Sequence, residues 1–139
     1  MTEQRRAALQ IEHLATHDAL TGLPNQVSLM CDVQQALKNG EFGALLRIDI
    51  DHFRRFNENY GHRAGDQLLI AVAGIMRDLV GDEEATVYRD NGDQFAVHLT
   101  NANSQHAESL AQSILHALRQ FAPKLARSPA LMRVTGSSV

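Results

Sequence analysis

The Asn91-Gly92 pair lies between two runs of residues that are typical of β-strands. The runs are residues 85–88 before it and residues 95–99 after it. An Asn-Gly pair in this setting is the strongest short-range signal for a tight two-residue turn. We therefore expect an antiparallel hairpin with its tip at residues 89–95, and this pair of strands restricts the folds open to the chain.

Hydrophobic periodicity predicts the other elements. Residues 43–50 form a nearly continuous apolar run, interrupted by Asp49 near its end, which suits a central strand covered on both faces. Helices are expected over residues 3–15, 26–38, 52–59, 67–80 and 102–121, and a last strand over residues 131–135. Residues 60–66, with two glycines, are expected to form a loop. This order predicts an α+β domain with helices packed on a small sheet.

The helix expected over residues 26–38 offers one set of apolar residues for burial. The set is Val27, Met30, Cys31, Val33, Ala36 and Leu37. Cys31 is the only cysteine, and we expect a buried structural thiol there. Asn39-Gly40 is expected to end this helix in a left-handed conformation.

Length and composition exclude several classes of protein. The chain has 139 residues, which fits a single domain, and its net charge of −3 argues against a nucleic-acid-binding surface. No apolar run approaches the roughly 20 residues of a membrane span, and no signal peptide is visible. A single cysteine cannot form an internal disulfide, so a cytoplasmic location is the default expectation.

Polar residues stand at three places where a packed core would not favour them. A buried Asp49 would need a partner, and an equally weighted alternative is that it caps the following helix. Asn57 and Asp66 flank the glycine-containing stretch and could converge on one ligand, although loop capping is the simpler reading. At the hairpin tip, Gly92 permits close approach of a phosphate, and Asp93 can hold a hard cation.

Several segments together carry a resemblance to a known family. They are Asp18-Ala19-Leu20-Thr21-Gly22-Leu23-Pro24-Asn25, residues 48–57 (IDIDHFRRFN), residues 60–69 (YGHRAGDQLL), Tyr88-Arg89, and residues 91–95 (NGDQF). In order and spacing they resemble the motifs of GGDEF domains, the family of diguanylate cyclases, from residue 18 onward. The resemblance implies a palm-like, nucleotide-cyclase-type fold with a mostly antiparallel central sheet flanked by helices. It also implies a role in bacterial cyclic di-GMP signalling.

The resemblance also implies an activity. Active members condense two GTP molecules into cyclic di-GMP, with two domains facing each other and divalent cations (Mg²⁺ or Mn²⁺) assisting the attack on the α-phosphate. By position, Asp49, the Ile50 backbone carbonyl and Asp93 would hold metal. Asp93 and Gln94 would be the catalytic positions.

Five positions would contact the nucleotide by the same resemblance. Asn57 and Asp66 would read the guanine edge, and Gly92 would lie against the phosphates, with Asn91 beside it. Arg54 could reach the phosphates, and a solvated helix face is an equally weighted reading.

Three departures from the family pattern bear on activity. Gln94 stands where the family has a metal-binding glutamate, and an amide oxygen brings no negative charge to Mg²⁺. We therefore expect weakened metal binding and absent or very low cyclase activity. Asn91 replaces the first glycine of the signature; it tolerates a left-handed backbone, but its side chain could crowd the phosphates. Residues 82–85 lack the Arg-x-x-Asp product site, which predicts no product inhibition there.

The expected organisation is an N-terminal linker or signalling helix over residues 1–16 and a GGDEF domain over residues 17–139, truncated at its C-terminal end. The chain is expected to be part of a larger protein, with a sensor upstream and a phosphodiesterase possible downstream. Partners would be GTP and a second copy or a neighbouring domain, with no nucleic acid and no membrane span. Three hypotheses stay open: a degenerate GTP-binding regulatory domain, which we favour, an active cyclase, and a nucleotide-free interaction domain.

Overall fold

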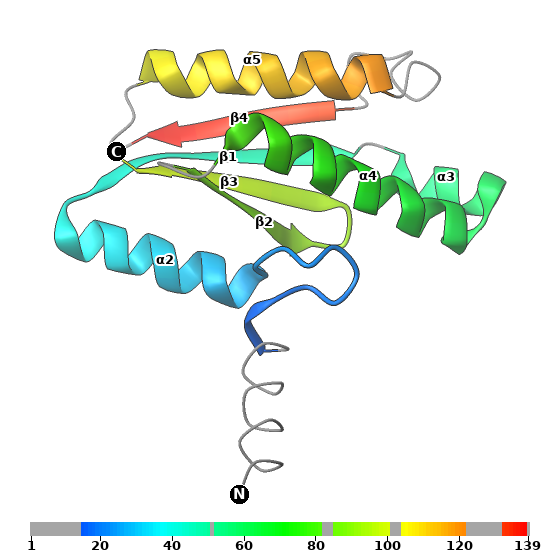
Figure 1. The fold of residues 1–139 in the computed structure, drawn as a ribbon, viewed down its shortest axis with the longest axis horizontal. Helices are drawn as coiled ribbons and strands as arrows, with labels where there is room; N and C mark the ends of the chain where they lie inside the picture. Colours follow the sequence, from blue (N-terminus) through cyan, green and yellow to red (C-terminus); the bar gives the residue numbers. More distant parts are fainter. Residues whose placement is uncertain (1–14, 51, 82–84, 101–103, 122–131, 139) are drawn as a thin grey trace, which may run out of the picture.

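The computed structural model describes residues 15–138 except residues 51, 82–84, 101–103 and 122–131. In chain order its elements are α2 (Gln26–Asn39), β1 (Phe42–Ile50), α3 (Phe53–Tyr60), α4 (His62–Val80), β2 (Ala85–Asn91), β3 (Gln94–Thr100), α5 (Ser104–Phe121) and β4 (Met132–Ser138) (Figure 1). The helix expected over residues 3–15 lies, except for its last residue, outside the described residues.

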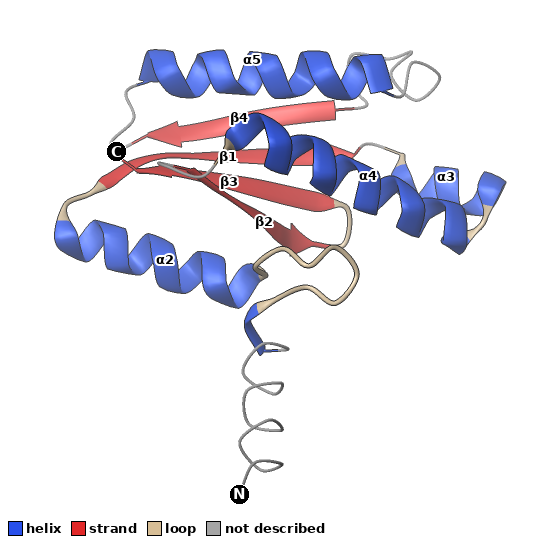
Figure 2. Ribbon diagram, in the orientation of Figure 1, coloured by secondary structure: helices blue, strands red, loops and turns tan. Residues whose placement is uncertain are grey.

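The strands form one sheet in the order β2-β3-β1-β4, and every neighbouring pair is antiparallel. Figure 2 shows helices on both sides of this sheet. The expected α+β fold with an antiparallel sheet flanked by helices is confirmed. The hairpin expected from the Asn-Gly pair is β2 and β3, and the apolar run is the central strand β1.

One face of the sheet carries the main core, against α4 and α5. Its largest fully buried members come from alternate positions of the strands and from the inner faces of both helices: Ile48, Ile50, Phe95, Val97, Leu99, Leu69, Val72, Met76, Ile114 and Leu118. The opposite face is covered in part by α2, through a smaller cluster of Leu29, Tyr88 and Ala96. In Figure 1, α2 and α5 lie on opposite sides of the strands.

The burial expected for α2 was wrong in most of its members. Ala36 is buried and Val33 is partly buried, but Val27 and Met30 are each 55% exposed, and Cys31 is exposed rather than a buried thiol. The face that packs on the sheet follows the spacing of Leu29, Val33 and Ala36, which is the i, i+4, i+7 pattern of a single helical stripe. The remaining apolar residues lie off this stripe, so α2 covers the sheet with a narrow face.

The loop expected over residues 60–66 was also wrong. Helix α4 begins at His62, and only Gly61 separates it from α3. Gly61 has a φ of 92° and donates its N–H to the Asn57 carbonyl at 2.7 Å, so one glycine with a positive φ ends the first helix and precedes the second. Gly65 lies inside α4, where it needs no unusual backbone angles; Asp66 is therefore not an N-cap.

Candidate functional site at the end of the central strand

The residues predicted to hold metal meet at one end of the sheet. Asp49 of β1 lies opposite Gln94 of β3 in the antiparallel register, and the Ile50 N–H donates to the Asp93 carbonyl at 3.1 Å. The two strands are far apart in sequence, and antiparallel pairing brings the end of one to the start of the other. Asp49, Ile50, Asp93 and Gln94 therefore form one contiguous group.

Asp49 has an unpaired oxygen in a buried position. Its Oδ1 atom is shielded from solvent and has no hydrogen-bond partner among the described residues. The alternative that Asp49 caps the next helix does not hold, because the N-cap of α3 is His52, with a φ of 60° and no side-chain cap bond. An unpaired buried carboxylate oxygen is costly, which makes this atom a candidate ligand for a cation.

The residue types at and beside Asp49 include those that hold Mg²⁺ in phosphate-transfer sites. Mg²⁺ in phosphate-transfer sites is commonly held by one or two carboxylates together with substrate phosphates and water. Asp49 and Asp93 each carry a carboxylate, and Gln94, which lies opposite Asp49 in the register, carries only a neutral amide. Within the described residues, no three His, Cys, Asp or Glu side chains are grouped as a metal site. Among the described residues predicted to hold metal, two side chains, Asp49 and Asp93, are charged.

The turn that carries Asp93 is displaced by one residue from the expected one. Asn91 pairs with Gln94, so the two turn residues are Gly92 and Asp93 rather than Asn91 and Gly92. The register shifts between Arg89 and Asn91, which is the signature of a β-bulge with one extra residue in β2. Gly92 has a φ of 31°, whereas Asn91 does not adopt a positive φ, so its left-handed tolerance is not used.

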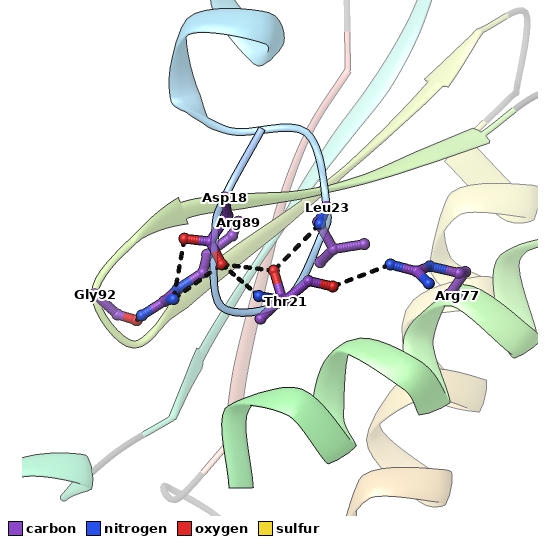
Figure 3. A network of polar contacts seen from close by, with 6 residues as sticks. All are labelled: Asp18, Thr21, Leu23, Arg77, Arg89 and Gly92. Atoms are coloured by element: carbon purple, nitrogen blue, oxygen red, sulfur yellow. Dashed lines mark hydrogen bonds and ion pairs between the residues drawn. The ribbon is translucent and has the colours of Figure 1, made fainter. Parts of the chain in front are cut away.

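Arg89 fastens this turn to the loop that precedes α2 (Figure 3). Its Nη1 atom lies 3.1 and 3.0 Å from the two carboxylate oxygens of Asp18, and its Nε and Nη2 atoms donate to the Gly92 carbonyl at 3.2 and 2.8 Å. The same Asp18 carboxylate accepts from the Thr21 N–H at 2.8 Å and the Thr21 hydroxyl at 2.7 Å. A single guanidinium therefore fixes the position of the turn carbonyl.

The electrostatics of Asp18 match this geometry. Burial alone would raise the pKa of the Asp18 carboxyl, but the two hydrogen bonds from Thr21 and the Arg89 guanidinium outweigh burial and hold it below its ordinary value. The backbone adds a further tie, because the Arg89 N–H donates to the Pro24 carbonyl at 2.9 Å. Asp18 and Arg89 are part of the sequence motifs, but their spacing of 71 residues gave no sign that they pair.

A hollow lies behind the turn. It has a volume of about 360 Å³. It is lined by Asp18, Asn25, Gln26, Val27, Arg89, Asp90, Asn91 and Gly92. Asn91 and Gly92 of the turn line this space together with Arg89, the side chain that hydrogen-bonds the Gly92 carbonyl.

The predicted guanine-reading residues lie where α3 contacts α4. A Cβ atom built on Gly65 would lie 1.7 Å from Asn57 Oδ1 and 2.8 Å from its Cγ, so the Asn57 side chain occupies the space that glycine leaves. Asn57 Oδ1 is buried and has no hydrogen-bond partner among the described residues. Asp66 follows Gly65 directly and is exposed. Asn57 therefore lies in the helix contact, whereas Asp66 lies exposed next to it in sequence, and no hydrogen bond joins the two side chains.

The remaining candidates differ in exposure. The Arg54 side chain is 94% exposed and pairs with Glu58, one helical turn away, at 3.6 Å. Asn91 is exposed beside the turn. For Arg54 and Asn91, contact with a nucleotide therefore remains a prediction.

Two charged residues on the site's face were missed in the sequence. Arg47 lies two positions before Asp49 on β1, and its Nη2 atom is 3.6 Å from Asp90 Oδ2 on β2. The sequence does carry a signal for Arg47, because Arg47 and Asp49 alternate with Ile48 and Ile50, which are buried, within the apolar run. This alternation indicates a strand with one open face near its end, rather than the expected strand covered on both faces.

Comparison with known proteins defines the class. Residues 15–138 match the family described as "Diguanylate cyclase, GGDEF domain". Solved structures with the same fold include "Vibrio cholerae LapD S helix-GGDEF-EAL (bound to c-di-GMP)", with a TM-score of 0.86 at 18% identity over 99% of this chain and 32% of that chain. The coiled coil and GGDEF domain of DgcB from Caulobacter crescentus gives a TM-score of 0.72 at 26% identity, covering 81% of this chain and 61% of that chain.

Proteins that are similar to this chain in sequence indicate the same family. The chain is 34% identical over 122 residues to "Cyclic di-GMP phosphodiesterase PdeR" of Escherichia coli, covering 86% of this chain and 18% of the relative. It is 32% identical over 119 residues to "Diguanylate cyclase VdcA" of Vibrio cholerae, covering 86% of this chain and 35% of the relative. The chain belongs to the GGDEF family, and it spans about a fifth to a third of the length of these two relatives.

In the part of the chain that the structure describes, no helix combines the length and the apolar character needed to cross a bilayer.

Proposed function

We propose that this chain is a degenerate GGDEF domain that binds GTP and acts as a regulatory unit of a larger protein in cyclic di-GMP signalling, with absent or weak cyclase activity. The observation that carries the proposal is the position of Gln94, whose backbone lies directly opposite Asp49. A carboxylate at this position would add a charged ligand beside Asp49 and Asp93. The amide would leave a site that still binds a nucleotide but that carries less negative charge for two cations.

The nucleotide part of the proposed site rests on four residues. Asn57 and Asp66 would hydrogen-bond the base, because a carboxylate suits the adjacent N1–H and N2–H₂ donors of guanine. Gly92 would lie against the phosphates, and Arg89 holds that glycine carbonyl in place. When bound, Mg²⁺ would neutralise phosphate charge at Asp49 and Asp93, with the Ile50 carbonyl as a further ligand.

A second candidate is an active diguanylate cyclase that tolerates glutamine. The unpaired, buried Asp49 Oδ1 atom favours it, because this oxygen is available to a cation whatever stands at position 94. Incubation of the protein with GTP and Mg²⁺ or Mn²⁺, followed by chromatography, separates the two candidates. The regulatory proposal predicts no cyclic di-GMP above the background without protein, and clear turnover would overturn it.

Binding of GTP is tested separately. Calorimetric titration is expected to give micromolar affinity that Asp66→Ala abolishes, whereas Glu108→Ala on α5 leaves it unchanged. If GTP does not bind, the chain is a nucleotide-free interaction domain and the proposal fails.

If Gln94 is the main lesion, Gln94→Glu combined with Asn91→Gly should restore measurable cyclase activity in the full-length parent. Continued inactivity with normal folding and GTP binding would place the lesion elsewhere or in failure to form the two-domain assembly.

The organisation of the parent is also part of the proposal. Residues 1–16 would be a linker or signalling helix and residues 17–139 the GGDEF domain, joined to a sensor or a phosphodiesterase, or paired with a second copy. Residues 82–84 lie outside the described residues, so the missing product site stays a prediction from the sequence. It is checked by adding cyclic di-GMP to the rescued variant, whose activity should not fall.

A further inference from the structure

Arg47 and Asp49 occupy the same face of β1, in neighbouring rows of the sheet. Asp49 lies opposite Gln94 on β3, and Arg47 lies opposite Ala96. The residues between and beyond them, Ile48 and Ile50, are buried in the main core on the other face. Because side chains alternate along a strand, Arg47 and Asp49 both point away from that core. The Arg47 side chain therefore starts one row from the proposed metal and phosphate position, on the same face of β1.

The Arg47 side chain reaches across the sheet. Strand β3 lies between β1 and β2, and Arg47 Nη2 is 3.6 Å from Asp90 Oδ2 on β2. The side chain must pass over Ala96, whose methyl group is small enough to allow the crossing and is fully buried. The guanidinium consequently lies toward β2, at the edge of the sheet, near the bulge that precedes Asn91.

Asp90 holds Arg47 in this position. The Asp90 side chain is only 4% exposed and stands at the bulge just before the turn. Its Oδ1 atom has no hydrogen-bond partner among the described residues, so the Arg47 cation is its main charge compensation. A buried carboxylate without a nearby cation would be strongly destabilising. The pair therefore links the central strand to the turn and restrains the guanidinium.

Most of the donor capacity of Arg47 is unused. The contact with Asp90 is longer than a good hydrogen bond, and within the described residues the Arg47 side chain makes no other ion pair or hydrogen bond. Its side chain is 51% exposed, so the guanidinium is accessible from the open face. A guanidinium carries five N–H donors in a planar fork that suits phosphate oxygens.

We propose that Arg47, positioned by Asp90, binds the phosphates of the nucleotide in this site and allows phosphate binding without a full complement of divalent cations. This inference rests on the proposed GTP binding. Gln94 removes one negative charge from the site, and Arg47 adds a positive one in the next row. Both changes favour an anionic ligand and disfavour a second dication. The site is thereby suited to retaining GTP rather than converting it.

The test is calorimetric titration of the full chain with GTP and with guanosine, each in EDTA and in Mg²⁺. Arg47→Met should weaken GTP binding in EDTA by about tenfold or more, and should leave guanosine binding unchanged. Arg119→Met is the matched control, because Arg119 is exposed in the last turn of α5. It should change neither ligand's affinity.

Arg47→Met leaves the Asp90 carboxylate buried without its cation, so folding is checked by thermal melting. The double variant Arg47→Met with Asp90→Asn removes that charge and is expected to fold and to show the same loss of GTP affinity. If unmodified protein binds GTP and either folded variant binds it equally well in EDTA, the Arg47 proposal is overturned and GTP binding stands. If unmodified protein does not bind GTP under either condition, both proposals fail.

Discussion

Gly65 offers the sharpest test of the α3–α4 contact. Adding one methyl group there places a Cβ 1.7 Å from Asn57 Oδ1, 2.8 Å from its Cγ and 3.2 Å from Phe53 Cζ. No real Cβ atom tolerates the first of these distances, so the Asn57 side chain must leave its position in Gly65→Ala. Gly74, in the same helix α4, has nothing within 4 Å of an added Cβ and serves as the matched control.

The magnitudes follow from two opposing effects. Alanine is favoured over glycine inside a helix by about 1 kcal/mol, so Gly74→Ala should raise the free energy of unfolding by roughly that amount. At Gly65 the same gain is offset by overpacking, which costs roughly 1–3 kcal/mol. The two variants should therefore differ by about 1–3 kcal/mol in urea unfolding, with Gly65→Ala the less stable. Equal stabilities would contradict the overpacking expected at Gly65 and would mean that the Asn57 side chain moves aside at little cost.

The same pair of variants tests the role of Asn57. If Asn57 hydrogen-bonds the base, its displacement in Gly65→Ala should weaken GTP binding about 2- to 12-fold, which corresponds to one hydrogen bond of about 0.5–1.5 kcal/mol. Asn57→Ala should show a similar loss, and Gly74→Ala should show none. Unchanged GTP affinity in folded Gly65→Ala would remove Asn57 from the proposed site while leaving the packing argument intact.

Three further predictions concern stability. The pKa of Asp18 is lowered in the folded state, so its contribution to the free energy of unfolding is present above pH 3.8 and is lost as the pH falls below that value. Asp18→Asn should therefore reduce the loss of free energy of unfolding, measured in urea, between about pH 5 and 2. An unchanged pH dependence would contradict this prediction. Burial lowers the pKa of His98, and Asp32 partly opposes this shift. The unfolded state therefore binds a proton more readily than the folded state, and the free energy of unfolding should fall as the pH drops below 6.5. His98→Gln should reduce this dependence on pH, and an identical dependence would refute the prediction. The Tyr88 hydroxyl donates a hydrogen bond to Asp32 at 2.5 Å, so Tyr88→Phe should lower the free energy of unfolding by roughly 0.5–1.5 kcal/mol. Tyr60 has an exposed side chain, and Tyr60→Phe should change this free energy by less than about 0.5 kcal/mol. Equal effects of the two substitutions would count against the Tyr88 hydrogen bond.

Local patterns predicted much of the fold. The Asn-Gly pair located the hairpin, and the apolar run located the central strand, because turns and strands depend on near neighbours in sequence. The bulge before Asn91 moved the turn by one residue, and this depends on how β2 pairs with β3 rather than on either sequence alone. In the same way, two glycines suggested a loop, whereas Gly61 alone ends α3 and Gly65 serves helix packing.

In the candidate site, too, local motifs were found in the sequence and long-range contacts were not. Asp49, Asp93 and Gln94 were named from the motifs, and the register places Asp49 and Gln94 opposite each other with Asp93 beside them. The pairing of Arg47 with Asp90 was not found, because it requires the strand order β2-β3-β1 and a small residue between the two charges. Such long-range pairs have no local signal. Exposure of Cys31 was missed because α2 contacts the sheet with a narrow stripe.

The proposed function requires that this site binds GTP and that Gln94 deprives it of one metal-ligand charge. The most direct measurement is the dissociation constant of Mn²⁺, read by electron paramagnetic resonance with saturating GTP, for the protein and for Gln94→Glu. We predict that Gln94→Glu binds Mn²⁺ about tenfold or more tightly than the unchanged protein, and that Asp93→Asn binds Mn²⁺ less tightly than the unchanged protein. Equal Mn²⁺ affinity in the protein and in Gln94→Glu, with GTP bound to both, would contradict the account.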